Sequence, residues 1–344
     1  MKPIAITMGD PAGIGPEIVV KAFRDAPEIS RGCFVAGDVE TMRRANRMLA
    51  AAGKLAMPVV VLQTVDDMQL LPPNCVPVLQ VIEPPQDVAI GHVSTAAGRA
   101  AGGCVEWAAR AALDGEISAL VTAPLHKEAL SAAGYRFPGH TELLQAEAAA
   151  WLKRPIAEVP VRMMLANDEL RTVLVSIHMS LRDAIAAVHL QGVLDTIRIA
   201  HRALGTALGR PPRIGVAGLN PHAGEGGLFG TEERDIIAPA VAAAQREGID
   251  ARGPYAPDTV FMRARATPEK IGEFDVVIAM YHDQGLIPVK YLGVDKGVNV
   301  TLGLPLVRTS PDHGTAFDIA GTGQADPASL IEAIRMARAL LPVV

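Results

Sequence analysis

The alternation of short apolar runs with longer alanine-rich stretches is the feature that most limits what this chain can fold into. The apolar runs have the length of buried strands, and the stretches between them have the length of helices. This order is expected of βαβ units, in which successive strands are parallel and helices cover the sheet. It predicts an α/β fold with strands near residues 4–7, 34–36, 59–62, 76–82, 120–122, 161–165, 172–177, 214–217 and 276–280.

Local signals place the helices between these strands. Asp38 can cap a helix over residues 39–51, and Ser94 precedes a helix over residues 95–113. Further helices are expected at residues 181–188, 193–208 and 232–247. A chain of 344 residues is long enough for about two domains. We expect the first over residues 1–130, to which a C-terminal segment of about 305–344 can cross back, and the second over residues 131–304.

Composition and charge exclude several kinds of partner. The formal net charge is −5 and only 4% of the residues are aromatic, so the chain offers neither a basic stripe nor stacking platforms for nucleic acid. The apolar runs are far shorter than the roughly 20 residues that a membrane-spanning helix needs. The N-terminus has no secretory signal pattern, and Cys33, Cys75 and Cys104 form no disulfide or metal motif. We therefore expect a cytoplasmic protein with no nucleic acid or membrane partner.

A glycine-rich loop at residues 9–17 joins the first strand to a helix, with Pro16 in its first turn. The glycine spacing is GxxxGxG, which is neither the dinucleotide fingerprint GxGxxG nor the Walker pattern. Both a structural turn and an anion-binding helix N-terminus remain open for this loop.

Three histidines, His178, His222 and His282, each follow an apolar run of strand length. Because carboxyl ends of parallel strands meet at the edge where α/β sheets bind ligands, the three side chains can converge on one point. Three neutral imidazoles suit Zn²⁺ or Co²⁺ and leave positions open for a substrate. Taken singly, however, each is also compatible with a solvated or hydrogen-bonded loop histidine.

A second group of residues has the chemistry of an anion site. His140 and Thr141 open a predicted helix, where Thr141 can cap and free backbone N–H groups favour a phosphate or carboxylate. Lys290, Asn299 and Arg308 add an ammonium, an amide and a guanidinium, the donors that a phosphate monoester needs. Each of them alone could equally be a solvated surface residue.

Several unusual strings together carry a family resemblance. They are MGDPAGIGPE, PGHTE, GLNPHAGEGGLFG, PDT, AMYHDQGLIPVK and GVNVTLGLPLVRTSPDHGTAFDIAG, and they extend from residue 8 to residue 321. In this order the chain resembles the 4-hydroxythreonine-4-phosphate dehydrogenase family of pyridoxine biosynthesis over nearly its whole length.

The resemblance implies two α/β/α domains around a cleft, similar to isocitrate and isopropylmalate dehydrogenases. It also implies a homodimer with the active site at the subunit interface. The implied metal ligands are His178, His222 and His282, and an acidic residue near the metal falls on Asp258. The implied substrate contacts are His140, Thr141, Lys290, Asn299 and Arg308. Contacts to the nicotinamide cofactor stay unassigned.

The implied reaction is the oxidation of 4-(phosphooxy)-L-threonine by NAD or NADP, with decarboxylation to 3-amino-2-oxopropyl phosphate. A divalent ion, Zn²⁺ first with Co²⁺ or Mg²⁺ as alternatives, would acidify the substrate hydroxyl and stabilise the enolate. Asp258 or a water would take the hydroxyl proton, while Lys290 and Arg308 hold the remote phosphate.

Related members of the family use the same scaffold on threonate or erythronate 4-phosphate, or on aromatic cis-dihydrodiols of the terephthalate type. The phosphate-type donors favour a phosphorylated substrate over a dihydrodiol. A metal-dependent hydrolase also fits three histidines with an open position, and NADH formation at turnover distinguishes it from a dehydrogenase.

Overall fold

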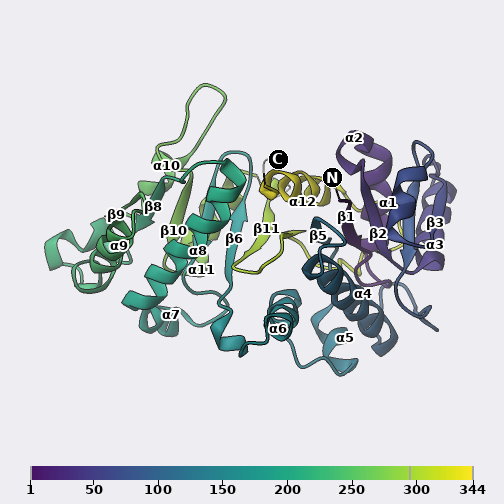
Figure 1. The fold of residues 1–344 in the computed structure, drawn as a ribbon, viewed down its shortest axis with the longest axis horizontal. Helices are drawn as coiled ribbons and strands as arrows, with labels where there is room; N and C mark the ends of the chain where they lie inside the picture. The colour runs from purple at the N-terminus through teal and green to yellow at the C-terminus, as the bar shows by residue number, and fades with distance from the viewer. Residues whose placement is uncertain (1, 294–295, 343–344) are drawn as a thin grey trace. The chain divides into compact units, whose positions relative to one another are not determined.

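The computed structural model describes residues 2–293 and 296–342, and the chain divides into two compact units. The first comprises Met1–Pro160 and Leu304–Ala339, and the second contains Val161–Gly303. Each unit combines a sheet with helices, so the predicted α/β class is confirmed (Figure 1).

In the sheet of the first unit, each strand is parallel to the strands with which it pairs. Its strands are β1 (Ile4–Thr7), β2 (Cys33–Gly37), β3 (Val59–Leu62), β4 (Val76–Gln80), β5 (Ala119–Thr122) and β12 (Arg308–Pro311). They are ordered β3-β4-β2-β1-β5-β12. Every residue of β1, β2 and β5 is buried, which is why these strands appear in the sequence as continuous apolar runs.

Two helices of the first unit, α3 (Val39–Ala51) and α4 (Thr95–Leu113), begin where local signals predict. Asp38 caps α3 by accepting from the Thr41 N–H at 2.7 Å, and the Ser94 hydroxyl oxygen caps α4 by accepting from the Ala97 N–H at 3.1 Å. The helices are α1 (Gly15–Asp25), α2 (Pro27–Ser30), α3 (Val39–Ala51), α4 (Thr95–Leu113), α5 (Lys127–Ala132), α6 (His140–Leu152) and α12 (Ala328–Leu340), with short 3₁₀ turns η1 (Val65–Leu70) and η2 (Ile156–Glu158).

Helix α4 organises the core of this unit. It packs across β2, β1 and β5 and also contacts α5 and α6. Trp107 on α4 meets the ring of Phe34 edge-on at 6.2 Å, and Leu143 and Leu144 of α6 are buried in the same cluster. Each such side chain contributes about 1.5–3 kcal/mol by leaving water. This packing of α6 on α4 places residues 131–160 in the first unit, whereas the sequence suggested the second domain for them.

The sheet of the second unit is mixed. Its strands are β6 (Arg162–Ala166), β7 (Arg171–Leu174), β8 (Ile214–Ala217), β9 (Ala251–Tyr255), β10 (Val276–Ala279) and β11 (Val298–Leu302), ordered β11-β6-β7-β10-β8-β9. The expectation of parallel neighbours is wrong for β6, which pairs antiparallel with both β7 and β11. Asn167 is the reason at one end, because its side-chain oxygen accepts from the Glu169 and Leu170 N–H groups and closes a hairpin.

The helices of the second unit are α7 (Leu181–Ala187), α8 (Leu190–Leu208), α9 (Ala238–Arg246), α10 (Val260–Ala264) and α11 (His282–Tyr291), with a 3₁₀ segment η3 (Pro221–Gly227) and a π-helix η4 (Glu233–Ile237). The single helix expected over residues 232–247 is therefore a π-helix that continues into α9. Among residues 2–293 and 296–342, we find no helix with the length and apolar character needed to span a membrane.

Candidate functional site

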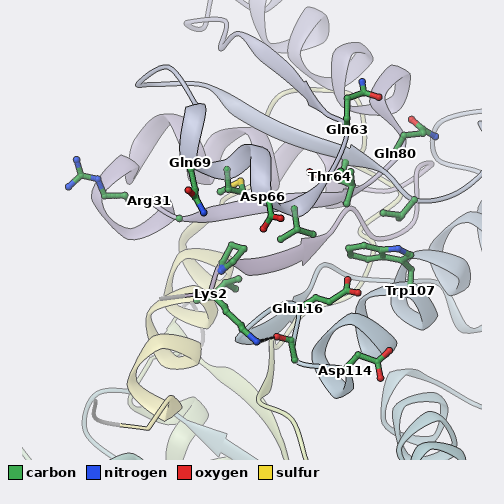
Figure 2. Close-up of a pocket in the computed structure, with 18 of the residues that line it drawn as sticks. Lys2, Arg31, Gln63, Thr64, Asp66, Gln69, Gln80, Trp107, Asp114 and Glu116 are labelled. Carbon is green, nitrogen blue, oxygen red and sulfur yellow. Dashed lines mark hydrogen bonds between the residues drawn. The ribbon is translucent and has the colours of Figure 1, made fainter.

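A broad hollow of about 1140 Å³ in the first unit holds none of the residues expected to carry chemistry. It is lined by residues that precede β1, β2 and β5, including Lys2 and Glu116, and by the 63–69 segment. Figure 2 shows Trp107 along one side of this hollow, with Lys2 bonded to the backbone of Gly115. Size alone therefore does not locate the site, and strand topology is a better guide.

The three histidines predicted at strand ends lie beyond three adjacent parallel strands. The order β7-β10-β8 makes β10 the central strand, and it pairs in parallel with both neighbours. His178 follows β7, His282 follows β10 and His222 follows β8. The prediction that all three emerge at the carboxyl edge of one sheet is therefore confirmed.

Hydrogen bonds between neutral groups tie these three strand ends together. The Ser176 hydroxyl, beyond β7, donates to the Met280 carbonyl at 3.0 Å. The side chain of Gln284 accepts from the Met280 N–H at 2.7 Å and donates to the Gly218 carbonyl, beyond β8, at 2.8 Å. Ser176 and Gln284 are buried, so the edge that carries the histidines is internally braced.

His178 and His282 lie side by side. Their ring centroids are 5.7 Å apart and the ring planes are tilted by 42°. His282 Nδ1 is 2.7 Å from an oxygen of Asp283, and this contact favours a proton on Nδ1 and a lone pair on Nε2. Both imidazoles line a hollow of about 450 Å³.

His222 and Asp258 line a second hollow of about 650 Å³. Tyr281 and Asp283 line both this hollow and the one that contains His178, so the two adjoin. Within the part of the chain that the structure describes, no three histidine, cysteine, aspartate or glutamate side chains are grouped closely enough to hold one metal ion. The structure thus brings two of the three proposed ligands together and places the third in the neighbouring hollow.

The backbone at two of these histidines is strained. His178 has φ of 28° and His222 has φ of 53°, both in the left-handed region that side chains with a Cβ avoid. Such a conformation costs roughly 1–2 kcal/mol for each non-glycine residue. Strain of this kind persists only where the surrounding structure enforces it, and it is concentrated at functional sites.

Arg308, a predicted substrate contact in the first unit, is only 3% exposed. Its Nε and Nη2 groups donate to the Thr122 hydroxyl oxygen at 3.1 and 2.7 Å. Burial lowers the pKa of Arg308 to about 10, with the Glu142 carboxylate acting in the opposite direction. The guanidinium therefore still carries its positive charge at neutral pH.

His140 lies close enough to Arg308 for the two to influence each other electrostatically. Burial, and then the Arg308 charge, hold the pKa of His140 well below its usual value, so the ring is neutral at pH 7. His140 Nε2 is buried and has no hydrogen-bond partner among the described residues. The expectation that Thr141 caps the helix is wrong, because α6 already begins at His140 and Gly139 is the residue before it.

The remaining predicted substrate contacts belong to the second unit. Lys290 is partly buried in the last turn of α11. Asn299 lies on β11 opposite Leu165 of β6 and is also partly exposed.

The glycine-rich loop before α1 shows close packing. A Cβ atom at Gly15 would lie 2.5 Å from the Met8 carbonyl oxygen, and one at Gly13 would lie 2.9 Å from Thr315. Pro16 occupies the first turn of α1, as expected. These close approaches explain why residues 13 and 15 of the loop are glycines.

Comparison with known proteins shows to which family this chain belongs. The family model described as "Pyridoxal phosphate biosynthetic protein PdxA" matches residues 30–337. The chain belongs to the PdxA family. The resemblance read from its sequence motifs is therefore confirmed.

Individual PdxA relatives cover nearly the whole chain. A 4-hydroxythreonine-4-phosphate dehydrogenase of Beijerinckia indica is 52% identical over 95% of this chain and 92% of its own length. A D-threonate 4-phosphate dehydrogenase of Pectobacterium atrosepticum is 44% identical over 98% of this chain and 99% of its own. The crystal structure of a 4-hydroxythreonine-4-phosphate dehydrogenase from Klebsiella pneumoniae superposes with a TM-score of 0.85, at 41% identity and 99% coverage of both chains.

A more distant neighbour is a terephthalate 1,2-cis-dihydrodiol dehydrogenase from Burkholderia xenovorans, with a TM-score of 0.67 and 31% identity over 100% of this chain and 99% of that one. These relatives are all dehydrogenases, so this PdxA family member is an oxidoreductase of that class.

Proposed function

We propose that this protein oxidises 4-(phosphooxy)-L-threonine with NAD or NADP and a divalent metal ion, and that loss of CO₂ then yields 3-amino-2-oxopropyl phosphate. We also propose that it acts in the cytoplasm as a homodimer. The observation that carries the proposal is the alignment of His178, His282 and His222 beyond three adjacent parallel strands in a dehydrogenase family.

The donor chemistry of this edge fits a divalent ion. The bond between His282 Nδ1 and Asp283 leaves Nε2 for a ligand, and the ring of His178 lies beside it. His222 and Asp258 supply a third imidazole and a carboxylate from the adjoining hollow. Neutral imidazoles of this number suit Zn²⁺, with Co²⁺ and Mg²⁺ as alternatives.

When bound, the ion would supply Lewis-acid polarisation of the substrate hydroxyl and the nicotinamide would supply the hydride acceptor. The residues of this edge have two tasks. His178, His222 and His282 orient the reacting end of the substrate, and Asp258 is exposed in the same hollow as His222, where it can take the hydroxyl proton.

The anion-binding residues support a phosphorylated substrate. Arg308 is a buried positive charge, and His140 next to it presents an unpartnered ring nitrogen. A phosphate monoester can use the fixed charge and donors of a guanidinium, whereas a neutral dihydrodiol ring cannot. Thr141, Lys290 and Asn299 are the other substrate contacts that we propose.

D-threonate 4-phosphate and erythronate 4-phosphate are the second candidate substrates. They share the phosphate and the hydroxy acid with the leading candidate, and the relative from Pectobacterium is 44% identical over 98% of the chain. An aromatic cis-dihydrodiol is the third candidate, and it lacks the group that Arg308 would bind.

Exposed apolar side chains beside the histidines support a subunit interface. Leu181 on α7 is 58% exposed and follows His178, while Tyr291 on α11 is 90% exposed. Met179 and Ile287 are exposed near them. Exposed apolar side chains next to a polar site are typical of a surface that another protein covers.

The decisive experiment measures kcat/KM for the phosphorylated acids, unphosphorylated 4-hydroxythreonine and a carboxylated cis-dihydrodiol, each with NAD and with NADP. We expect 4-(phosphooxy)-L-threonine to have the highest value, with NADH or NADPH absorbance rising at turnover. A higher kcat/KM for D-threonate 4-phosphate would replace the proposed substrate, and turnover without reduced nicotinamide would remove the redox assignment.

A mixing experiment tests the shared site. Variants His222→Ala and His282→Ala, whose side chains line adjoining hollows, are each expected to be inactive alone. If the two ligands come from different subunits, mixed dimers should recover part of the activity. Confirmed heterodimers with no activity would argue against sharing between this pair.

A further inference from the structure

The segment that carries His222 has an unusual backbone. Five successive residues, 222 to 226, have positive φ values of 53°, 53°, 80°, 43° and 68°. Three of these residues, His222, Ala223 and Glu225, are not glycine, although this region favours glycine. A left-handed turn of this length needs contacts elsewhere that hold it.

Glu233 provides those contacts from the π-helix η4. Its side chain is buried, and its Oε1 accepts from the backbone N–H groups of Leu219 and Asn220, both at 2.7 Å. Its Oε2 accepts from the Asn220 side-chain amide at 3.0 Å. Burial raises the pKa of Glu233, but these hydrogen bonds outweigh it and leave the pKa below its usual value.

Two glycines allow the carboxylate to sit against the turn. A Cβ atom at Gly224 would lie 2.7 Å from Glu233 Oε2, and one at Gly218 would lie 3.0 Å from Oε1. A Cβ atom at Gly226, by contrast, would have no other atom within 4 Å. The carboxylate is therefore packed inside the loop, with donors on one side and glycine backbone on the other.

We propose that Glu233 is a positioning residue that holds the left-handed turn and so fixes the direction in which His222 points. It acts through Leu219 and Asn220, at the start of the segment, and through the close contact with Gly224. Functional sites frequently contain π-helical turns, and η4 begins at this residue. The inference rests on the proposed role of His222 as a ligand of the metal.

The test uses Co²⁺ as the probe and the full-length protein. Glu233→Gln keeps the size of the side chain but replaces one acceptor oxygen with an NH₂ group, which opposes either the backbone donors or the Asn220 side-chain amide. Asp235→Asn is the matched control, because Asp235 lies on the same helix and pairs with exposed Arg234. His222→Ala provides the reference for loss of the ligand itself.

We expect Glu233→Gln to weaken Co²⁺ binding about 10- to 100-fold, as second-layer changes around metal ligands do. Its visible Co²⁺ spectrum should shift toward that of His222→Ala, which a general loss of stability would not cause. Amide hydrogen exchange at Leu219 and Asn220 should rise even without metal. Asp235→Asn should match the parent protein in all three measurements.

A glycine pair gives an independent reading if Glu233→Gln fails to fold. Gly224→Ala and Gly226→Ala place a Cβ at similar left-handed φ values, but only the first meets Glu233. Gly224→Ala should therefore weaken Co²⁺ binding more than Gly226→Ala does. Equal effects of the two would overturn the proposal.

Two further outcomes are decisive. If Glu233→Gln binds Co²⁺ with the parent affinity and spectrum, Glu233 does not position His222. If the parent protein itself binds no Co²⁺, the proposed metal site fails, and amide exchange of the variant alone then decides whether Glu233 holds the turn.

Discussion

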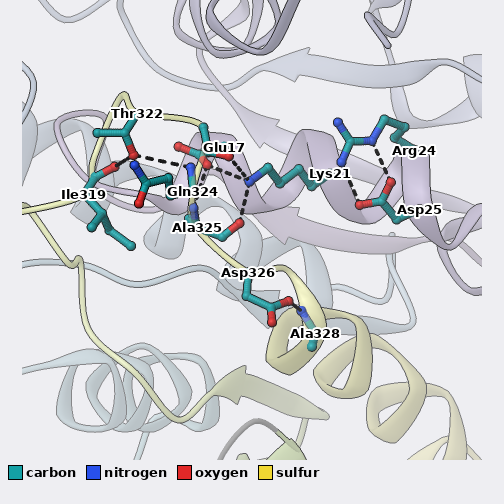
Figure 3. Close-up of polar contacts among 11 residues, drawn as sticks. Glu17, Lys21, Arg24, Asp25, Ile319, Thr322, Gln324, Ala325, Asp326 and Ala328 are labelled. Atoms are coloured by element: carbon teal, nitrogen blue, oxygen red, sulfur yellow. Dashed lines mark hydrogen bonds and ion pairs between the residues drawn. The ribbon is translucent and has the colours of Figure 1, made fainter. Parts of the chain in front are cut away.

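Replacing Lys21 by methionine should sharply destabilise the first unit, because it removes the charge that neutralises a buried carboxylate. Lys21 and Glu17, on successive turns of α1, are 5% and 2% exposed, and Nζ is 2.7 Å from Glu17 Oε1. The ammonium also donates to the carbonyls of Gly323 and Ala325, so it joins α1 to a segment some 300 residues away. Figure 3 shows Lys21 extended from the helix into this group of acceptors.

The expected magnitude follows from what remains after the substitution. Glu17 Oε1 would keep its bond from the Ala325 N–H at 2.9 Å. Oε2 is buried and has no hydrogen-bond partner in the described part of the chain. Removing one member of a buried ion pair costs about 3–5 kcal/mol. At about 2–4 °C per kcal/mol for a domain of 150–250 residues, the melting temperature should fall by about 6–20 °C.

Calorimetric unfolding measures the global effect, and amide exchange in residues 319–326 measures the local one. Arg43→Met is the control, because Arg43 pairs with Glu40 on the surface at 44% and 61% side-chain exposure. Such a pair contributes less than about 1 kcal/mol. Glu17→Gln combined with Lys21→Met should recover part of the loss, since an amide needs no countercharge.

A free energy of unfolding of Lys21→Met within about 1 kcal/mol of the parent protein, no worse than the loss of a surface pair, would refute a stabilising role of the lysine charge. This role would also be refuted if the double variant were less stable than the single one. In either case the buried carboxylate would not depend on the lysine charge.

Three further predictions concern the site and its support. Arg308→Ala should lower kcat/KM for the phosphorylated acid about 10- to 100-fold, and Arg308→Lys should restore part of this loss. An equal loss of kcat/KM with unphosphorylated 4-hydroxythreonine would contradict a role of Arg308 in phosphate recognition. Burial raises the pKa of Asp275, but hydrogen bonds from Arg210 and Arg213 dominate and hold it far below its usual range. Asp275→Asn should therefore lower the free energy of unfolding by about 1–3 kcal/mol at pH 7. In urea titrations this difference from the parent protein should shrink as the pH falls below about 4, where the carboxyl of the unfolded chain is protonated. A difference that does not depend on pH would exclude the ion pairs as its source. Chelation should abolish activity and Zn²⁺, Co²⁺ or Mg²⁺ should restore it, and full turnover by protein shown to be metal-free by elemental analysis would rule out the metal.

Local sequence signals predicted the fold well where the determinants are close in the chain. The helices after Asp38 and Ser94 begin where expected, because a cap and its N–H partner are three residues apart. The strands β9, β11 and β12 were not expected. The sequence of β9 is ARGPY and that of β12 is RTSP, so their place in a sheet depends on neighbouring strands rather than on an apolar pattern.

The residues of the candidate site were likewise predicted where the signal is local in the sequence and missed where it is not. The histidines were found because strand ends are visible in the sequence and parallel strands end at one edge. Glu233 was missed because its partners, Leu219 and Asn220, are 14 and 13 residues away. In sequence, a Thr-Glu-Glu run at the start of a helix is typical of a solvated surface. Burial of one of its carboxylates is a property of the folded loop alone.

The bracing of the histidine edge bears on the pH dependence of the proposed reaction. The three strand ends are joined by hydrogen bonds among Ser176, Met280, Gln284 and Gly218. The hydroxyl, amide and backbone groups that form these bonds do not titrate in the physiological range. Their geometry should therefore stay constant while the pH changes. Any dependence of metal binding on pH between 5 and 8 must then arise outside these hydrogen bonds. Ser176→Ala and Gln284→Ala should consequently weaken metal binding by a similar factor at every pH in this range.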